Sequence, residues 1–183
     1  LRAGGAALAA VAFALWVGAE RPALLIAGDG GLGGVMGEEG RILSKPKGGG
    51  FIAKNWLEDD GDPALQEEAF VRGGTPAKRG TWQGRFGEKP IYHLTGKTAP
   101  ERAAALCASA APGTMMVLNG DWPEGADRHG CEVFDQTRLR RTGALAFRNS
   151  DEGTAITTAR QVAGERLWNS RAADGRQRLA AAQ

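Results

Sequence analysis

The sequence predicts one domain of mixed strands and helices, of the α/β or α+β class, preceded by an apolar helix. Short apolar runs bounded by glycines and polar turns, which are typical of strands, recur along the chain, and segments with helical spacing lie between them. About 160 residues follow the apolar segment, which is enough for one core and too few for two. We therefore divide the chain into an apolar segment at 1–19, a soluble domain at 20–170 and a polar tail at 171–183.

The apolar segment carries no charge between residue 3 and Glu20. A transmembrane helix needs about 20 apolar residues, so we interpret residues 1–19 as the C-terminal part of one, with further span upstream and Trp16 at the membrane interface. A secretory signal peptide, which Arg2 and the small residue Ala19 favour, and a buried soluble helix are the alternatives. Each of the three places a folded domain after residue 20.

The first half of the domain is expected to begin with a β-meander. The strands lie at 23–27, 32–36 and 41–44, and Glu38, Glu39 and Gly40 form the turn between the last two. A helix is expected from Phe51 until Asp59-Asp60-Gly61-Asp62-Pro63 ends it, and a second at 64–71.

The second half alternates between the two kinds of element. We expect strands at 81–86, 90–94, 114–118 and 131–134, and helices at 99–109 and 136–141. Thr98 is a candidate N-cap for the helix at 99–109, with Pro100 in its first turn. Strands 144–147 and 155–159 are expected to pair across a turn at 149–153.

Two glycine motifs resemble phosphate-binding loops. Gly28 to Gly33 matches G-x-G-x-x-G after a strand, but glycines interrupt the helix that must follow, so we interpret the segment as a tight hairpin. Gly96-Lys97-Thr98 matches the end of a Walker A loop, but Ile91 stands where the first glycine belongs. We therefore predict no cofactor.

Candidate metal ligands are few, because the chain has two histidines, His93 and His129. His129, Cys131 and Cys107 do not follow a usual zinc spacing. Asp59, Asp60 and Asp62 suggest a cation site, but they lie at a helix C-terminus, where the helix dipole disfavours negative charge, and we expect a solvated turn. No serine, histidine and aspartate arrangement can be placed. The residues therefore indicate neither catalytic nor metal-binding side chains.

Charge and cysteine content bear on nucleic-acid binding and on the cellular compartment. The formal net charge is +2, which is not that of a strongly basic nucleic-acid-binding protein. The C-terminal third is richer in arginine, and a solvated basic surface is the ordinary explanation. Two cysteines, Cys107 and Cys131, permit one disulfide outside the cytoplasm and are otherwise two buried thiols.

Three stretches together carry a resemblance to a known family. They are Asn55-Trp56-Leu57-Glu58-Asp59-Asp60-Gly61-Asp62, then Cys131-Glu132-Val133-Phe134-Asp135 with Arg138-Leu139-Arg140-Arg141-Thr142-Gly143-Ala144-Leu145-Ala146, and Thr158-Ala159-Arg160-Gln161-Val162-Ala163-Gly164-Glu165-Arg166-Leu167-Trp168. They resemble the C-terminal end of the ComEC family of competence proteins. Those proteins form the inner-membrane channel for DNA uptake in natural transformation, and in many of them a metallo-β-lactamase-like domain follows the last membrane helix.

The resemblance implies a degenerate metallo-β-lactamase-like mixed sheet with flanking helices. The His-x-His-x-Asp-His signature of catalytic members is absent, so no nuclease activity and no catalytic residue carry over. The family's domain is extracytoplasmic on the inner membrane, which favours a Cys107–Cys131 disulfide. Single-stranded DNA, the rest of the channel and other competence proteins are the implied partners, with DNA-backbone contacts at Arg138, Arg140 and Arg141.

Two other function classes stay open. One is a metal-dependent nuclease with an atypical ligand set drawn from His129, Cys131, Cys107 and Asp62. The other is an unrelated secreted binding domain, which a start codon just upstream of Leu1 would support.

Overall fold

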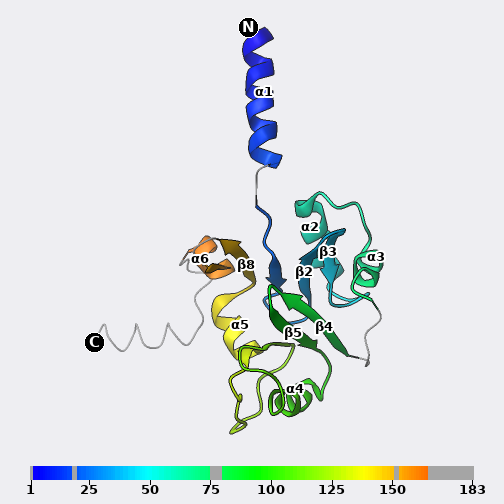
Figure 1. Cartoon of the computed structure of the whole chain (residues 1–183), viewed down its shortest axis with the longest axis vertical. Coiled ribbons are helices and arrows are strands. Elements are labelled where there is room, and N and C mark those ends of the chain that lie inside the picture. Colours follow the sequence, from blue (N-terminus) through cyan, green and yellow to red (C-terminus); the bar gives the residue numbers. More distant parts are fainter. Residues whose placement is uncertain (1, 18–19, 75–79, 151–152, 165–183) are drawn as a thin grey trace, which may run out of the picture.

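The computed structural model describes residues 2–17, 20–74, 80–150 and 153–164. The helices within these ranges are α1 (Arg2–Val17), α2 (Gly50–Asp60), α3 (Gln66–Val71), α4 (Ala99–Cys107), α5 (Gln136–Thr142) and α6 (Ala159–Ala163). The strands are β1 (Leu24–Ile26), β2 (Gly33–Gly37), β3 (Gly40–Leu43), β4 (Thr81–Phe86), β5 (Lys89–Leu94), β6 (Met115–Leu118), β7 (Glu132–Phe134), β8 (Leu145–Ser150) and β9 (Gly153–Thr158). Figure 1 shows α1 projecting away from the remaining elements.

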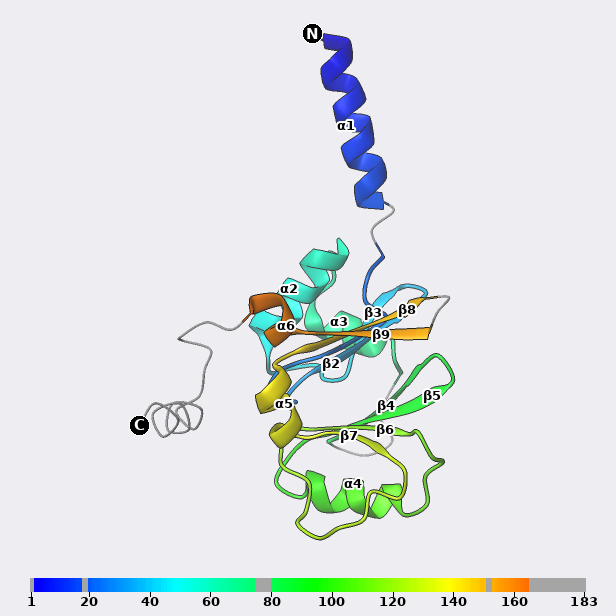
Figure 2. The ribbon, with the colours of Figure 1, turned by 90° about the vertical axis from the view of Figure 1, so that its left-hand side faces the viewer.

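The described strands form two sheets that face each other (Figure 2). One sheet has the order β3-β2-β1-β8-β9, and all its neighbours are antiparallel. The other has the order β4-β5-β6-β7: β4 and β5 form an antiparallel hairpin, while β5, β6 and β7 are parallel. Parallel neighbours need a crossover connection, and α4 supplies the one between β5 and β6. The domain is therefore a mixed α+β sandwich.

Three clusters of buried side chains fill the space between the layers of the domain. The central cluster lies between the sheets and includes Ile26, Phe134 and Phe147. A second cluster packs α4 against the four-stranded sheet, and a third packs α2 and α3 against the five-stranded sheet. These helices thus lie on the outer faces of the two sheets (Figure 2), while β9, at the edge of the five-stranded sheet, stays largely exposed.

Most elements predicted from the sequence are confirmed within about two residues. The β-meander, the β4–β5 hairpin, the helix after Thr98 and the pairing of β8 with β9 are all present. The expected turn at 149–153 is wrong in extent, because both strands continue further and Ser150 pairs with Gly153. The predicted tail at 171–183 and the end of the predicted domain at 165–170 lie outside the described residues.

The acidic segment after α2 is not the solvated turn that the sequence suggested. Arg41 is fully buried, and its guanidinium binds Asp60, with Nη2 2.9 Å from Oδ1. Arg41 also donates to the carbonyl oxygens of Gly34 and Pro22. Arg72 binds Asp62 and lowers the pKa of that carboxyl below its usual value, mainly through their hydrogen bond. These aspartates hold α2 and α3 against β3.

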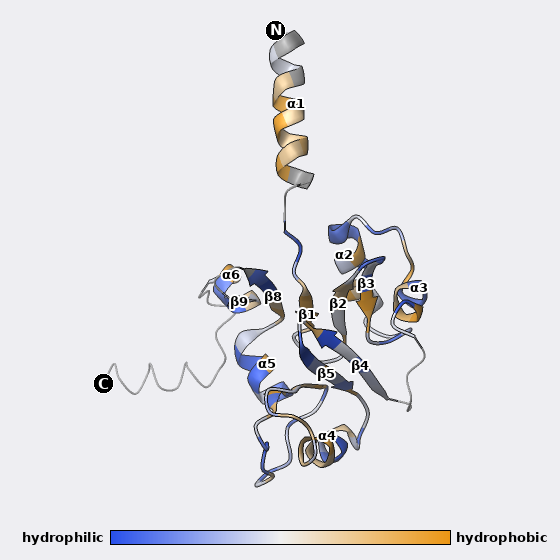
Figure 3. Cartoon of the chain, viewed as in Figure 1, coloured by the Kyte–Doolittle hydropathy of each residue, from blue (hydrophilic) through white to orange (hydrophobic). Residues whose placement is uncertain are grey.

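Helix α1 leaves large apolar side chains exposed. Leu8, Val11, Phe13 and Leu15 are between 57% and 73% exposed, and Figure 3 shows the apolar colour along the helix. No helix among the described residues has the length and apolar content that crossing a membrane demands.

A candidate anion-binding cleft

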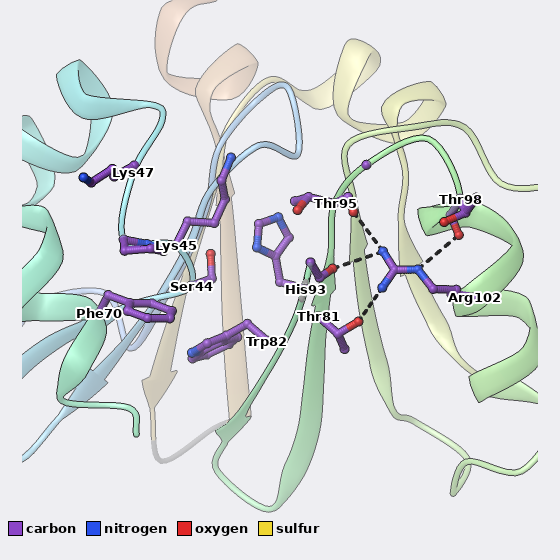
Figure 4. A pocket seen from close by; sticks show the side chains of 13 residues that line it. Ser44, Lys45, Lys47, Phe70, Thr81, Trp82, His93, Thr95, Thr98 and Arg102 are labelled. Atoms are coloured by element: carbon purple, nitrogen blue, oxygen red, sulfur yellow. Dashed lines mark hydrogen bonds between the residues drawn. The ribbon is translucent and has the colours of Figure 1, made fainter. Parts of the chain in front are cut away.

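A cleft of about 770 Å³ opens where the loop after β3 faces β4, β5 and the start of α4. Its walls come from Ser44 and Lys45 after β3, Phe70 in α3, Trp82 in β4 and His93 in β5. Figure 4 shows these side chains converging from separate elements. The volume is in the range of pockets that hold small organic ligands.

The loop that carries Lys45 is fixed by side chains around it. Gln66 Nε2 donates to the carbonyl oxygens of Lys45 and Gly48, at 3.1 and 2.9 Å. Gly48 and Gly49 have φ values of 87° and 72°, which suit glycine and let the chain turn directly into α2. Ser44, at the start of the loop, accepts a hydrogen bond from the Gly33 backbone at 2.8 Å. The loop therefore has a defined course.

His93 is the most deeply buried polar residue among those described in the cleft wall. It is 1% exposed, and Nε2 lies 2.9 Å from the Gly30 carbonyl oxygen, so Nε2 carries the proton and donates. Burial, with a smaller contribution from the nearby Lys45 charge, lowers the pKa of His93 to about 4. Nδ1 therefore carries a free lone pair, and this buried atom has no hydrogen-bond partner among the described residues.

Arg102 supports the opposite wall. Its guanidinium donates to Thr81 Oγ1 at 2.7 Å, to the carbonyl oxygens of Thr95 at 2.8 Å and Gly80 at 3.2 Å, and to that of Thr98 at 3.3 Å. Figure 4 shows this network from the side of the cleft. Arg102 thus joins α4 to the ends of β4 and β5 and adds positive charge to the wall.

The cleft is cationic. Lys45, Lys47 and Arg102 line it, and none of the described lining residues is acidic. Lys47 is exposed and pairs with Glu67 at 3.0 Å, whereas Lys45 Nζ has no ion-pair or hydrogen-bond partner in the described part of the chain. An ammonium with hydroxyl groups nearby is suited to binding an anion.

The cleft lacks the hydrogen bond that activates a serine nucleophile. Such a serine donates to a neighbouring base. Ser44 Oγ accepts from the Gly33 backbone, and no hydrogen bond joins it to His93 among the described residues.

The metal ligands considered from the sequence are not brought together. Cys107 and Cys131 form a disulfide with a Cα–Cα distance of 6.0 Å, and Asp62 is bound to Arg72. His129 lies in an exposed turn with φ 46°. Within the described residues, no group of three or more histidine, cysteine, aspartate or glutamate side chains is placed to hold a metal ion.

The two glycine motifs have structural roles beside the cleft. Gly28 to Gly33 forms the β1–β2 turn, as predicted. A Cβ at Gly30 would lie 1.9 Å from the Leu118 carbonyl oxygen, so only glycine allows this approach. The same turn supplies the carbonyl that His93 contacts. Gly96 and Thr98 line the cleft just before α4.

The arginines proposed for DNA contact differ in their surroundings. Arg138 stacks on Phe134, 4.1 Å from the ring centre, and pairs with Glu132 at 3.3 Å. Arg140 binds Asp121 at 2.6 Å and lowers the pKa of that carboxyl. Arg141 is exposed and has no partner in the described part of the chain. Two of these three guanidinium groups already have carboxylate partners.

Sequence reasoning missed the cleft. It treated Lys45 to Gly50 as a flexible connection and His93 only as a scarce metal ligand. The available signal was a single histidine inside an apolar strand, in the sequence Pro90-Ile91-Tyr92-His93-Leu94. A histidine there is buried with the strand and requires a polar partner.

Comparison with known proteins gave no relative. No family model matches the chain, and neither a curated protein nor a solved structure does.

Proposed function

We propose that the chain is the extracytoplasmic C-terminal domain of a ComEC-like inner-membrane channel for DNA uptake, and that it binds single-stranded DNA without cutting it. The observation that carries the proposal is the cationic cleft, where Lys45 is unpaired and no described lining residue is acidic. A polyanion such as DNA is attracted to a positively charged surface. An acidic surface would repel it, and a neutral surface would not attract it.

The stretches that carry the family resemblance support the proposal through their structural roles. Asp60 and Asp62 anchor the end of α2 through Arg41 and Arg72. Asp135 caps α5, accepting a hydrogen bond from the Arg138 backbone at 2.8 Å. Residues of this kind determine a fold, so their shared occurrence favours a common architecture. The mixed sheet with helices on its outer face is compatible with a degenerate metallo-β-lactamase-like domain.

Helix α1 supports the membrane part of the proposal. Its leucine, valine and phenylalanine side chains are largely exposed and would be buried favourably in a hydrocarbon phase. In this proposal α1 is the end of a longer membrane helix, and the domain follows it on the extracytoplasmic side.

The test is a combined binding and cleavage assay with the full 183-residue chain in detergent. A fluorescent 20-nucleotide single strand is incubated at low salt, alone, with Mn²⁺ or Zn²⁺, and with a chelator. We expect binding in every condition and an intact strand throughout. An absence of binding at low salt would refute the proposal. Cleavage that needs a metal and stops with the chelator would replace it with the nuclease alternative.

A further inference from the structure

The unpaired groups of the cleft specify more than an anion. His93 Nδ1 is a buried acceptor without a partner, although buried polar atoms are nearly always hydrogen-bonded. Since Nε2 donates to Gly30 and the ring stays neutral, Nδ1 can only accept. Figure 4 places the His93 ring beside Ser44 and Lys45 in the cleft. A ligand group that reaches Nδ1 can satisfy it only with an N–H or O–H donor.

At Lys45, by contrast, a ligand must offer a hydrogen-bond acceptor with negative charge. Its ammonium is close enough to His93 to disfavour protonation of the ring, and it has no carboxylate partner among the described residues. The neighbouring Ser44 hydroxyl accepts from Gly33 and has a proton left to donate. An anionic group with several acceptor oxygens matches this end of the cleft.

The wall beyond His93 is aromatic. Phe70 is half-buried and Trp82 is 5% exposed, and both line the cleft. The guanidinium of Arg102 already donates to Thr81, Gly80, Thr95 and Thr98. A planar, largely apolar ring is the group that gains most from contact with such a wall.

We propose that the cleft binds one nucleotide, with the phosphate at Lys45, a base N–H donating to His93 Nδ1, and the base packed against Phe70. This deepens the proposed function and rests on it for the single strand as the source of the nucleotide. A nucleotide combines a planar ring, an N–H donor and an anion at nearby positions, and the cleft volume of about 770 Å³ accommodates it. Inorganic phosphate can offer an O–H to His93 Nδ1, but it has no ring to pack against Phe70.

The test measures the Kd of the full chain for four probes: thymidine monophosphate, its N3-methyl analogue, inorganic phosphate and a ten-nucleotide thymidine strand. We expect thymidine monophosphate to bind at least about tenfold more tightly than the N3-methyl analogue, which lacks the N–H, and than phosphate. Equal affinities for thymidine monophosphate, its N3-methyl analogue and phosphate would overturn the proposed contact between the base and His93.

Two lysine variants test the location. Lys45→Met removes the unpaired ammonium, and Lys47→Met is the matched control because Lys47 is exposed and paired with Glu67. We expect Lys45→Met to weaken the binding of the mononucleotide and the strand at least about tenfold, and Lys47→Met to change it less than about threefold. Equal effects of the two variants would overturn the placement at Lys45.

The outcomes separate this proposal from the proposed function. If the strand binds and Lys45→Met changes nothing, the cleft proposal fails and DNA binding stands. If the mononucleotide binds through Lys45 and the strand does not bind, the cleft takes free nucleotides and the DNA role fails. If neither binds, both fail. The ¹⁵N resonance of His93 Nδ1 gives a readout that needs no variant: thymidine monophosphate should shift it, and the N3-methyl analogue, which keeps the phosphate and lacks the base N–H, should shift it less.

Discussion

Burial decides the protonation state of His93, and this has a consequence for stability. The folded protein holds the ring neutral with a pKa of about 4, whereas an unfolded chain has a histidine pKa near 6.5. Between these values the unfolded state binds more protons than the folded one. The contribution of the neutral His93 ring to the free energy of unfolding is therefore fully present above about pH 6.5, and it is lost as the pH falls toward 4.

We predict that the free energy of unfolding decreases by about 3 kcal/mol between pH 7 and pH 4 because of His93. Urea unfolding at several pH values measures it. His93→Gln retains an amide donor for the Gly30 carbonyl and lacks a titrating group, so its profile should be flatter over this interval. The lowered pKa of Asp62 begins to reduce stability only as the pH falls below about 5, and it does so in both proteins, so the comparison cancels it. Identical profiles for the two proteins would contradict the burial of a neutral ring.

The ion pair of Arg41 with Asp60 is the other decisive contact between single residues. Their side chains are 0% and 6% exposed, and removing one partner leaves a buried charge uncompensated. We predict that Arg41→Met destabilises the domain by about 3–5 kcal/mol.

The double variant Arg41→Met with Asp60→Asn is the control, because it removes both charges. It should be more stable than Arg41→Met alone, as measured by urea unfolding. Lys54→Met, which breaks the exposed pair with Glu58, should cost less than about 0.5 kcal/mol. A similar loss from Lys54→Met would show that burial is not the cause.

Among the elements, α4 depends on the disulfide that joins its last residue, Cys107, to Cys131 just before β7. The bond closes a loop with a sequence separation of 24 residues. Restricting an unfolded loop of this size is worth about 3–4 kcal/mol in the chain-entropy model.

We predict no free thiols in the unreduced protein from an oxidising compartment, and a loss of about 3 kcal/mol of unfolding free energy on reduction. A thiol count in denaturant and unfolding curves with and without reductant measure these two quantities. The Cys107→Ala, Cys131→Ala variant should match the reduced protein. Two thiols in the unreduced protein would contradict the bond and the extracytoplasmic location it favours.

Helix α1 is expected to bind membranes. Because Leu8, Phe13 and Leu15 are exposed and apolar, the chain should bind lipid vesicles through this helix. Phe13→Asp with Leu15→Asp should weaken vesicle co-sedimentation severalfold, whereas Phe51→Asp, at an exposed position in α2, should not. Equal effects of the two changes would argue against membrane contact through α1.

The sequence predicted elements better than it predicted contacts. Local signals were sufficient for the turn at Gly28 to Gly33 and for the helix after Thr98, because both depend on neighbouring residues. The helix begins with Pro100 in its first turn, although the Thr98 side chain makes no capping hydrogen bond. They were insufficient for Asp60, since its partner Arg41 lies 19 residues away and converts a polar turn into a buried anchor. The cleft was not predictable for the same reason: Lys45, Phe70 and His93 meet only after the sheets pack.

At the scale of the whole molecule, the sandwich brings the end of β3 next to β4 and β5, and this contact creates the cationic cleft. The net charge of the whole chain is only +2, so it does not indicate this local concentration of positive charge. The domain as proposed is held at the membrane by α1 and presents the cleft to a single strand of DNA.

The most direct test of DNA binding is the salt dependence of the Kd of the full chain for a fluorescent single strand. Phosphate contacts release counterions, so two to four contacts predict a slope of log K against log salt of about −1.4 to −2.8. Lys45→Met should make that slope shallower by about 0.7, and Lys47→Met should leave it closer to the wild-type value. A slope that Lys45→Met leaves unaltered would contradict the placement of the strand in the cleft, and a Kd that does not change with salt would contradict DNA binding itself.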